Sequence, residues 1–303
     1  MATVLLTGGS GLVGRYLCKR LQEKGYDVVI VSRTIKNNPT IPTYTWDLEK
    51  MEIEDNAIDM ADYIIHLAGE NIGDKRWNSG KKQQIIDSRV KTVELIFNKV
   101  KEQNKSLRAF ISASAIGYYG TLTSDKIFTE TDNSSDDFLG DLCKRWEQTS
   151  NRFKESGIRT VNIRTGIVLA KQGGVLSKLI IPVKTGIGSA IGDGKQYMPW
   201  IHIDDLCGIY IQAIEDIHMN GAYNAVAPDH KTNEEFIRII ARILKKSFWF
   251  PTIPAIIIKL IFGNMSEILL KGSRVSSEKI KSAGYTFLFP DLESALNNLI
   301  KKE

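Results

Sequence analysis

Three glycines near the start of the chain have the spacing of a phosphate-binding loop. Gly8, Gly11 and Gly14 follow the apolar run 4–6, and the segment 12–21 after them has apolar residues at helical spacing. Between a strand and a helix, such glycines allow a tight turn, close approach of the backbone to a pyrophosphate, and close packing of helix on strand. The N-terminus of the helix offers unpaired N–H donors to the negative charge. The pattern therefore predicts a dinucleotide-binding loop rather than an ordinary glycine turn.

The residues after the second expected strand, 28–31, bear on which dinucleotide binds. A site for NAD needs a carboxylate here for the ribose 2′-hydroxyl group, but the sequence has Ser32 and Arg33. A guanidinium forms bidentate, charge-assisted hydrogen bonds with a phosphate. We therefore expect NADP(H) rather than NAD(H); a solvated loop arginine is the alternative. Arg89, on the helix after the fourth strand, is either a second cationic contact to the cofactor or part of a surface ion pair.

Composition excludes several other classes of protein. The chain has 303 residues, of which 43% are hydrophobic and 25% are charged, as in ordinary globular proteins, and its net charge is only +5. The basic runs 81–82 and 245–246 are only dipeptides and have no interleaved aromatic residues, so we expect no nucleic-acid partner. The three cysteines are far apart, and the four histidines lack metal-ligand spacing. We therefore expect neither a disulfide framework nor a metal site.

Strand-like and helix-like segments alternate through the first half of the chain. The expected strands are 4–6, 28–31, 43–46, 63–67, 109–112 and 160–164, and the expected helices are 12–21, 79–102, 138–156, 232–245 and 292–300. Such alternation predicts an α/β fold with a doubly wound parallel sheet (Rossmann fold). The glycine-punctuated region after residue 170 predicts a smaller C-terminal subdomain on the substrate side. We divide the chain into residues 1–230, a dinucleotide-binding domain, and residues 231–303.

One apolar stretch in the tail, residues 256–269, has helical spacing. We expect it to pack against the core; a helix lying on a membrane surface is the alternative. The most apolar part, 253–262, is interrupted by Pro254 and Lys259 and is too short to span a bilayer. The start of the chain has no basic region of the kind found in signal peptides. We therefore expect a cytoplasmic protein with no membrane partner.

Several motifs together resemble one family. They are Thr7 before the glycine loop, HLAGEN at 66–71, SASAIGYYG at 112–120, PWIHIDDL at 199–206, and GSRV and AGYTF at 272–275 and 283–287. The pattern resembles extended short-chain dehydrogenases/reductases, and within them the atypical epimerase-like (NAD-dependent epimerase/dehydratase) family with a C-terminal domain of unknown function. Some of its members are labelled cell-division-inhibitor-like nucleoside-diphosphate sugar epimerases. The resemblance covers essentially the whole chain. It implies a small-molecule substrate, such as a nucleotide sugar, and a homodimer.

The glycine loop, the second strand and this resemblance together give the candidate cofactor contacts. By resemblance, residues 47–48 lie beside adenine, residues 66–71 touch the ribose and phosphates, and Gly166 and Ile167 border the nicotinamide. The full set is Gly8, Gly9, Ser10, Gly11, Leu12, Val13, Ser32, Arg33, Asp47, Leu48, Leu67, Ala68, Gly69, Gln84, Arg89, Gly166 and Ile167.

The catalytic pair of the superfamily, Tyr-x-x-x-Lys, is missing. None of the ten tyrosines has a lysine four residues later. Alignment by position puts Leu139 in place of the tyrosine and Cys143 in place of the lysine. Lys144 is one residue further along, which on a helix is a rotation of about 100°. We therefore expect Lys144 to point away from the site.

Three hydroxyl groups are candidate substitutes: those of Ser114, Tyr118 and Tyr119. A phenol without a neighbouring cation keeps a pKa near ~10 and is a poor base at neutral pH. For the two tyrosines, packing in the wall under the nicotinamide is the alternative. His202, Asp204 and Asp205 are interpreted as a helix cap after a strand.

Two hypotheses follow. The first is an NADP(H)-binding oxidoreductase or epimerase-like enzyme with an unusual proton donor. The second is a catalytically weak or inactive dinucleotide-binding module that acts as a redox sensor or regulatory partner. The retained cofactor motifs fit both, whereas the missing pair favours the second.

Overall fold

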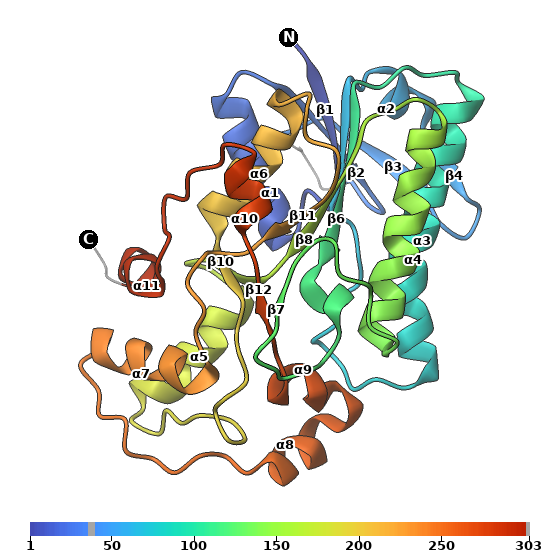
Figure 1. Ribbon diagram of the computed structural model, residues 1–303. Helices are drawn as coiled ribbons and strands as arrows, with labels where there is room; N and C mark the ends of the chain where they lie inside the picture. The colour runs from blue at the N-terminus through green and yellow to red at the C-terminus, as the bar shows by residue number, and fades with distance from the viewer. Residues whose placement is uncertain (36–39, 301–303) are drawn as a thin grey trace.

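A central sheet with helices on both faces organises the molecule (Figure 1). The computed structural model describes residues 1–35 and 40–300. The sheet has the strand order β11-β8-β6-β5-β1-β2-β3-β4. Its strands are β1 Thr3–Thr7, β2 Asp27–Ser32, β3 Thr43–Asp47, β4 Glu52–Ile53, β5 Tyr63–His66, β6 Ala109–Ala115, β8 Thr160–Thr165 and β11 Gly221–Ala225. The predicted doubly wound sheet is confirmed.

Seven of the eight strands are parallel, and β4 is the exception. It pairs antiparallel with β3 and consists of two residues, too few to give a periodic pattern in the sequence. The strand order runs outward in opposite directions from β1 and β5. In open α/β sheets, ligands bind beyond the carboxyl ends of the strands at such a switch point. This places the expected site at the ends of β1 and β5.

Two pairs of helices cover the two faces of the sheet. Helices α1 (Leu12–Glu23) and α6 (Ile203–Glu215) pack together on one face, and α3 (Ser79–Glu102) and α4 (Phe138–Glu155) on the other (Figure 1). Buried aliphatic side chains fill both layers. Under α4, the rings of Phe110 and Phe153 stack with their centroids 3.8 Å apart.

The remaining elements lie outside these layers, and most of them gather at the carboxyl end of the strands and along the α6 face. They are α2 Asp55–Asp59, η1 Ile116–Tyr119, β7 Ile127–Phe128, β9 Ile167–Leu169, α5 Gly174–Lys184, β10 Trp200–His202, α7 Asn233–Ile243, α8 Ala255–Phe262, η2 Gly263–Met265, α9 Ser266–Leu270, β12 Arg274–Val275, α10 Glu278–Ser282 and α11 Leu292–Ile300. Strand β12 pairs with β7, so the tail returns to the first half of the chain. One hydrophobic cluster joins α5, β9, α7 and α11 across residue 230. The division at that residue stays a prediction.

Asp205 fixes the tail to the core. Its buried carboxylate accepts hydrogen bonds from the backbone N–H groups of Leu288 (2.7 Å) and Phe289 (3.0 Å) and from the Tyr285 hydroxyl group (3.0 Å). His202 caps α6, as expected, by accepting from the N–H of Asp204. The 199–206 and 283–287 motifs therefore hold each other in place.

The apolar stretch in the tail is not buried as a whole, and this expectation is wrong. In α8 only Ile258 is buried, whereas Ile256, Ile257, Leu260 and Ile261 are exposed. The helix is apolar on every side, so only one of its faces can meet the rest of the molecule. Among residues 1–35 and 40–300, no helix is long and apolar enough to cross a membrane.

Candidate functional site

The glycine loop has the shape that a pyrophosphate cradle requires. Gly8 has a φ of +70°, which favours glycine, and a Cβ on Gly14 would lie 2.3 Å from the carbonyl oxygen of Gly8. The loop therefore lies directly on the first turn of α1. Gly11 is the N-cap of α1, and no side chain in the described parts of the chain caps it. Its first N–H groups are available to an anion, so the loop fits a dinucleotide.

A buried hydrogen-bond chain joins the ends of β1 and β5. The Thr7 hydroxyl group lies 2.8 Å from Nδ1 of His66 and accepts from the N–H groups of Leu67 and Ala68. The other ring nitrogen of His66 lies 3.1 Å from the Thr92 hydroxyl group. Burial, helped by the charge of Arg89, lowers the pKa of His66 to about 3. The imidazole is therefore neutral and holds the 67–69 loop against the glycine loop.

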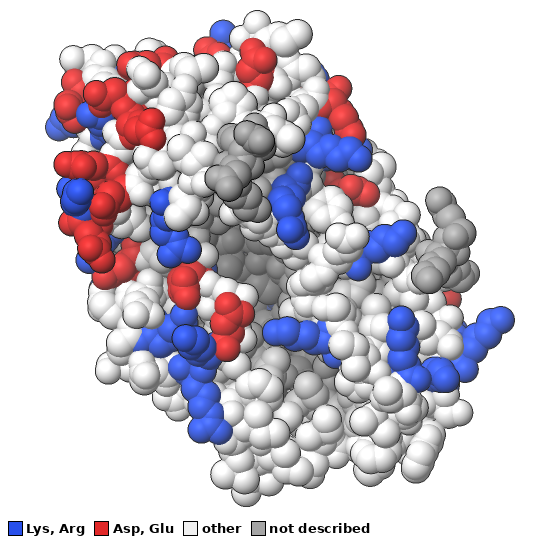
Figure 2. All heavy atoms as spheres, turned by 180° about the vertical axis from the view of Figure 1, so that it is seen from behind, with Lys and Arg blue, Asp and Glu red and all other residues white. Residues whose placement is uncertain are grey.

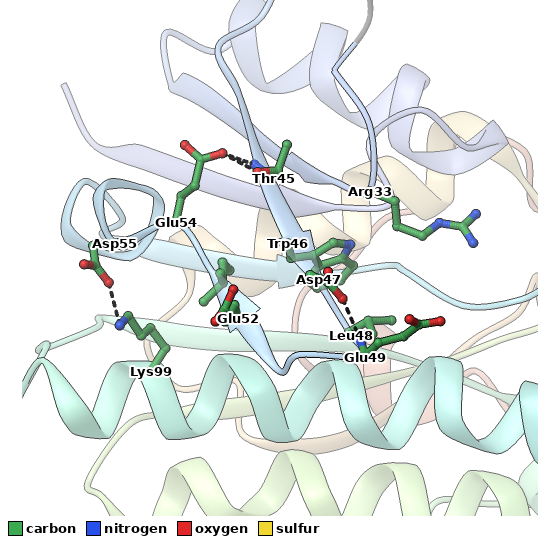
Figure 3. Close-up of a pocket in the computed structure, with 11 residues that line it drawn as sticks. Arg33, Thr45, Trp46, Asp47, Leu48, Glu49, Glu52, Glu54, Asp55 and Lys99 are labelled. Atoms are coloured by element: carbon green, nitrogen blue, oxygen red, sulfur yellow. Dashed lines mark hydrogen bonds and ion pairs between the residues drawn. The ribbon is translucent and has the colours of Figure 1, made fainter.

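The adenosine end of the expected site lies beside β3. Figure 3 shows an open cavity of about 940 Å³ there, with Arg33, Asp47 and Leu48 at one end and Asp55 and Lys99 at the other. The Asp47 carboxylate accepts from the N–H groups after it, and these hydrogen bonds lower its pKa. Five of the eleven lining residues are acidic, and none of the eleven belongs to the glycine loop. We therefore assign only its Arg33 end to the candidate cofactor site.

Arg33 and the loop after β5 are close enough to interact. The Glu70 carboxylate lies 2.6 Å from Nζ of Lys81, and this hydrogen bond is the main cause of its lowered pKa. The charges of Arg33 and Arg89 lower that pKa further. Three cations thus surround one carboxylate at the ribose end. Ser32 is half-buried at the end of β2, whereas Arg33 is exposed.

Arg89 and Gln84 lie differently, although both belong to α3. The Arg89 guanidinium donates to the carbonyl groups of Glu70 (3.0 Å) and Ile85 (3.1 Å) and lies 5.1 Å from the Trp146 ring centroid. It forms no ion pair with any residue in the described ranges. A surface ion pair is therefore the wrong reading of Arg89, which lines an inner cavity. Gln84 is exposed.

The inner cavity, of about 330 Å³, lies beyond the ends of β6 and β8. Gly166 and Ile167 line it, as do Leu139 and Cys143, the residues in place of the missing pair. Burial raises the pKa of the Cys143 thiol to about 12. Lys144 is exposed and does not line the cavity, as the helical rotation predicts. Most of the other lining side chains are aliphatic: Ile72, Ile116, Leu142, Val175, Leu179, Ile191, Met198, Ile268, Leu269 and Val275.

A buried polar network lies behind this wall. The Ser114 hydroxyl group donates to Glu147 (2.7 Å), and Glu147 binds Arg164 through two hydrogen bonds of 2.8 Å. Arg164 also donates to the hydroxyl group of Tyr119 (3.0 Å), which donates to Asn224 (2.7 Å). Burial opposes the charge of Arg164, but Glu147 outweighs this effect and raises its pKa. The network joins β6, η1, α4, β8 and β11.

Each of the three candidate hydroxyl groups therefore either is engaged in hydrogen bonds or lies outside the lining of the inner cavity. Tyr119 lines the inner cavity, but burial raises its pKa and its hydroxyl group is engaged on both sides. Ser114 is buried and does not line the inner cavity. Tyr118 does not line it either, and its ring stacks on the Arg164 guanidinium at 3.5 Å. Their catalytic role stays a prediction; the contacts favour a supporting role in the wall.

Sequence analysis missed Arg164 and Asn224 and used Glu147 only as an alignment point. One signal was present, because Arg164 is a charged residue at the end of a strand that is otherwise expected to be buried. Its partner could not be identified, since Glu147 lies 17 residues away on another element. In the part of the chain that the structure describes, no three His, Cys, Asp or Glu side chains gather as a metal site would require.

Comparisons with known proteins agree with this arrangement. The model of the NAD dependent epimerase/dehydratase family matches residues 4–225. The chain belongs to this family. A second model, Domain of unknown function (DUF1731), matches residues 253–299. The recognised resemblance is thereby confirmed.

Relatives of this chain are found in animals and bacteria. Epimerase family protein SDR39U1 of Mus musculus is 32% identical over 300 residues, 98% of this chain and 99% of the relative. Epimerase family protein YfhF of Bacillus subtilis is 33% identical over 299 residues, 98% of this chain and 97% of the relative. The similarity therefore extends over both matched regions.

Two solved structures are similar over nearly the whole chain. Human epimerase family protein SDR39U1 (isoform 2), crystallised with NADPH, is 31% identical, with a TM-score of 0.87 and 98% of each chain covered. A nucleoside-diphosphate sugar epimerase from Corynebacterium glutamicum is 32% identical, with a TM-score of 0.81; 99% of this chain and 58% of the other are covered. These likenesses support the NAD(P)-binding fold.

Proposed function

We propose that this family member is an NADP(H)-dependent oxidoreductase that acts on a small, mostly apolar substrate. The observation that carries the cofactor choice is Arg33 at the end of β2, where a site for NAD has a carboxylate. Ser32 precedes it, and Arg33 lies close enough to Glu70 to lower the pKa of that carboxyl. The NADPH in the SDR39U1 crystal structure supports the same choice.

Groups of this chain would bind successive parts of the cofactor. The α1 N-terminus would take the pyrophosphate, Ser32 and Arg33 the 2′-phosphate, and Gly166 and Ile167 would border the nicotinamide. Bound there, NADPH supplies a hydride. The aliphatic wall would exclude water and orient the substrate. Without a tyrosine–lysine pair, no lysine lowers the pKa of a phenol in this wall.

The inner cavity favours a small apolar substrate over a nucleotide sugar. Its volume of about 330 Å³ lies at the lower end of the usual range for ligand pockets, ~300 to ~1,000 Å³. Two substrate phosphates would need cations, and only Arg89 and Lys271 among its lining residues carry that charge. Lys271 lies 3.5 Å from Glu267. The nucleotide sugar suggested by resemblance is therefore the weaker candidate.

Titration calorimetry with NADPH and NADH tests the cofactor choice. We expect Arg33→Ala to weaken NADPH binding about 30-fold and to leave NADH binding within about 2-fold, because a charge-assisted bidentate contact is lost. Arg145→Ala, which removes an exposed arginine from α4, is the control and should change neither. Equal affinity of the unaltered protein for both dinucleotides would refute the proposal.

The second candidate is a dinucleotide-binding module without turnover. Leu139 and Cys143 in place of the catalytic pair favour it. NADPH oxidation measured with a panel of aliphatic and cyclic ketones and aldehydes, and in parallel with UDP-sugars, separates the two. Turnover with apolar carbonyls supports the oxidoreductase, whereas tight NADPH binding without turnover on either panel supports the module.

A further inference from the structure

The end of the molecule around α8 exposes an unusual set of apolar side chains. Trp249, Ile256 and Leu260 are 67–70% exposed, and Phe250, Ile257 and Ile261 are between 39% and 53% exposed. We call these six residues, together with Lys245, Lys246 and Lys259, the basic apolar surface. Helix α8 packs mainly against its own neighbours η2 and α9, so its outer face is uncovered.

The surface is held in place from two sides. The backbone of Ile253, just before α8, pairs with Ile191, and the Ser189 hydroxyl group donates to the carbonyl of Pro251. At the other end of α8, the Arg76 guanidinium donates to the carbonyl groups of Leu260 and Ile261. The apolar side chains are therefore presented by an ordered scaffold. The loop tied to this segment adds the exposed Ile187.

Charge along the segment that forms the surface has a single sign. Residues 236–266 contain no Asp or Glu and five Lys or Arg. Arg238 and Arg242 pair with glutamates, whereas Lys245, Lys246 and Lys259 form no ion pair with any residue in the described ranges. In Figure 2 the lower end of the molecule shows no acidic side chain, and Lys and Arg side chains lie on both sides above it.

We propose that the basic apolar surface binds an anionic lipid bilayer, with α8 lying in the plane of the interface. Exposed aliphatic and aromatic side chains flanked by lysines are the pattern of interfacial helices: the apolar groups enter the acyl boundary and the ammonium groups meet lipid phosphates. Lysine stems can also bury their methylene groups there. This replaces the expectation of no membrane partner and restores the surface-helix alternative for residues 256–269.

Charge argues against a second copy of this chain as the occupant. A twofold interface places the same patch on both subunits. Two basic apolar surfaces facing each other would bring Lys245, Lys246 and Lys259 of both copies together, and like charges across an interface repel. A bilayer with anionic headgroups supplies the opposite charge. An acidic protein partner is a different proposal, and it predicts no sedimentation with either kind of vesicle in the test below.

Co-sedimentation of the full chain with phospholipid vesicles tests this surface. We expect at least ~10-fold more protein bound to vesicles of phosphatidylcholine with phosphatidylglycerol than to phosphatidylcholine alone, and less at high salt, because exposed charges are screened. The double variant Ile256→Glu/Leu260→Glu should reduce binding at least ~10-fold. Ile217→Glu, which changes an apolar residue of similar exposure outside the surface, should bind like the unaltered protein.

The NADPH affinity and the melting temperature of each variant are measured to show that the variant is folded. Because NADPH binding is measured apart from vesicle binding, a failure of the lipid proposal can be told from a failure of the proposed function. Equal sedimentation with both kinds of vesicle, or none with either, would overturn the lipid proposal. So would a concentration-dependent dimer that the double variant dissociates, or loss of binding in Ile217→Glu. An unchanged double variant would show that another surface binds.

Discussion

The two ends of the candidate site are built in different ways. At the dinucleotide end, the glycine loop and the start of α1 are neighbours in sequence, and the contacts come from backbone groups. At the inner cavity, Ser114, Glu147, Arg164 and Tyr119 come from β6, α4, β8 and η1. Their side chains bind one another rather than a ligand.

Because of this difference, cofactor binding and proton transfer depend on different kinds of groups. A pyrophosphate is bound by N–H groups and by the absence of side chains, so the function survives wherever the glycines remain. Proton transfer needs particular side chains at one position on α4, and here these are Leu139 and Cys143. Cofactor binding can therefore be retained when the side chains around the inner cavity change. The predictions below perturb one end at a time.

The largest effect is expected from Gly14→Ala. A Cβ there would lie 2.3 Å from the Gly8 carbonyl oxygen and 2.6 Å from the Gly9 Cα, so the loop must move off α1. We expect calorimetry to show at least ~100-fold weaker NADPH binding, and urea unfolding to show a loss of about 3 kcal/mol. Gly80→Ala, in α3, meets nothing closer than 3.6 Å and should change neither. Unaltered binding by Gly14→Ala would break the comparison.

The next effect concerns the wall. Glu147→Gln leaves the Arg164 guanidinium buried without its counter-charge, which costs about 3 kcal/mol of unfolding free energy. NADPH affinity should change less than about 3-fold, because the network contacts no residue of the glycine loop. Asp141→Asn breaks an exposed ion pair with Arg145 on the same helix and should cost less than about 0.5 kcal/mol. A large loss of NADPH affinity in Glu147→Gln would show that the two ends are coupled.

The third effect is a pH dependence from the link between β1 and β5. His66 is neutral when folded because burial lowers its pKa to about 3, whereas an unfolded histidine titrates near ~6.5. As the pH falls below ~6.5 only the unfolded state gains this proton, so stability is full above ~6.5 and is lost toward the folded pKa.

Urea unfolding should therefore show a loss of about 2 kcal/mol between pH ~6.5 and ~5. His66→Gln should remove most of this dependence. His218→Gln, which changes an exposed histidine, should keep it. An identical pH profile in His66→Gln would mean that other groups cause the loss.

Sequence alone predicted the parts in which pattern and structure are local. The glycine loop, six of the seven parallel strands, the long helix at 79–102 and the rotation of Lys144 follow from periodicity and spacing within one element. The Glu147–Arg164 pair and the Asp205 contacts to the tail join distant segments, and no local pattern gives a partner at that range. The exposure of α8 was also missed, because an all-apolar helix gives no sign of which face is covered.

The smallest effect decides what the hydroxyl groups in the wall do. Ser114→Ala and Tyr119→Phe each remove one hydrogen bond of the network and should cost about 1 kcal/mol of unfolding free energy. If these groups only support the wall, kcat/KM for an apolar carbonyl should fall less than about 5-fold and its pH profile should keep its shape. A proton donor is worth ~100-fold or more. A fall of that size in either variant, with NADPH affinity retained, would restore that residue as a catalytic group and would mean that the wall kept its chemistry in a new place.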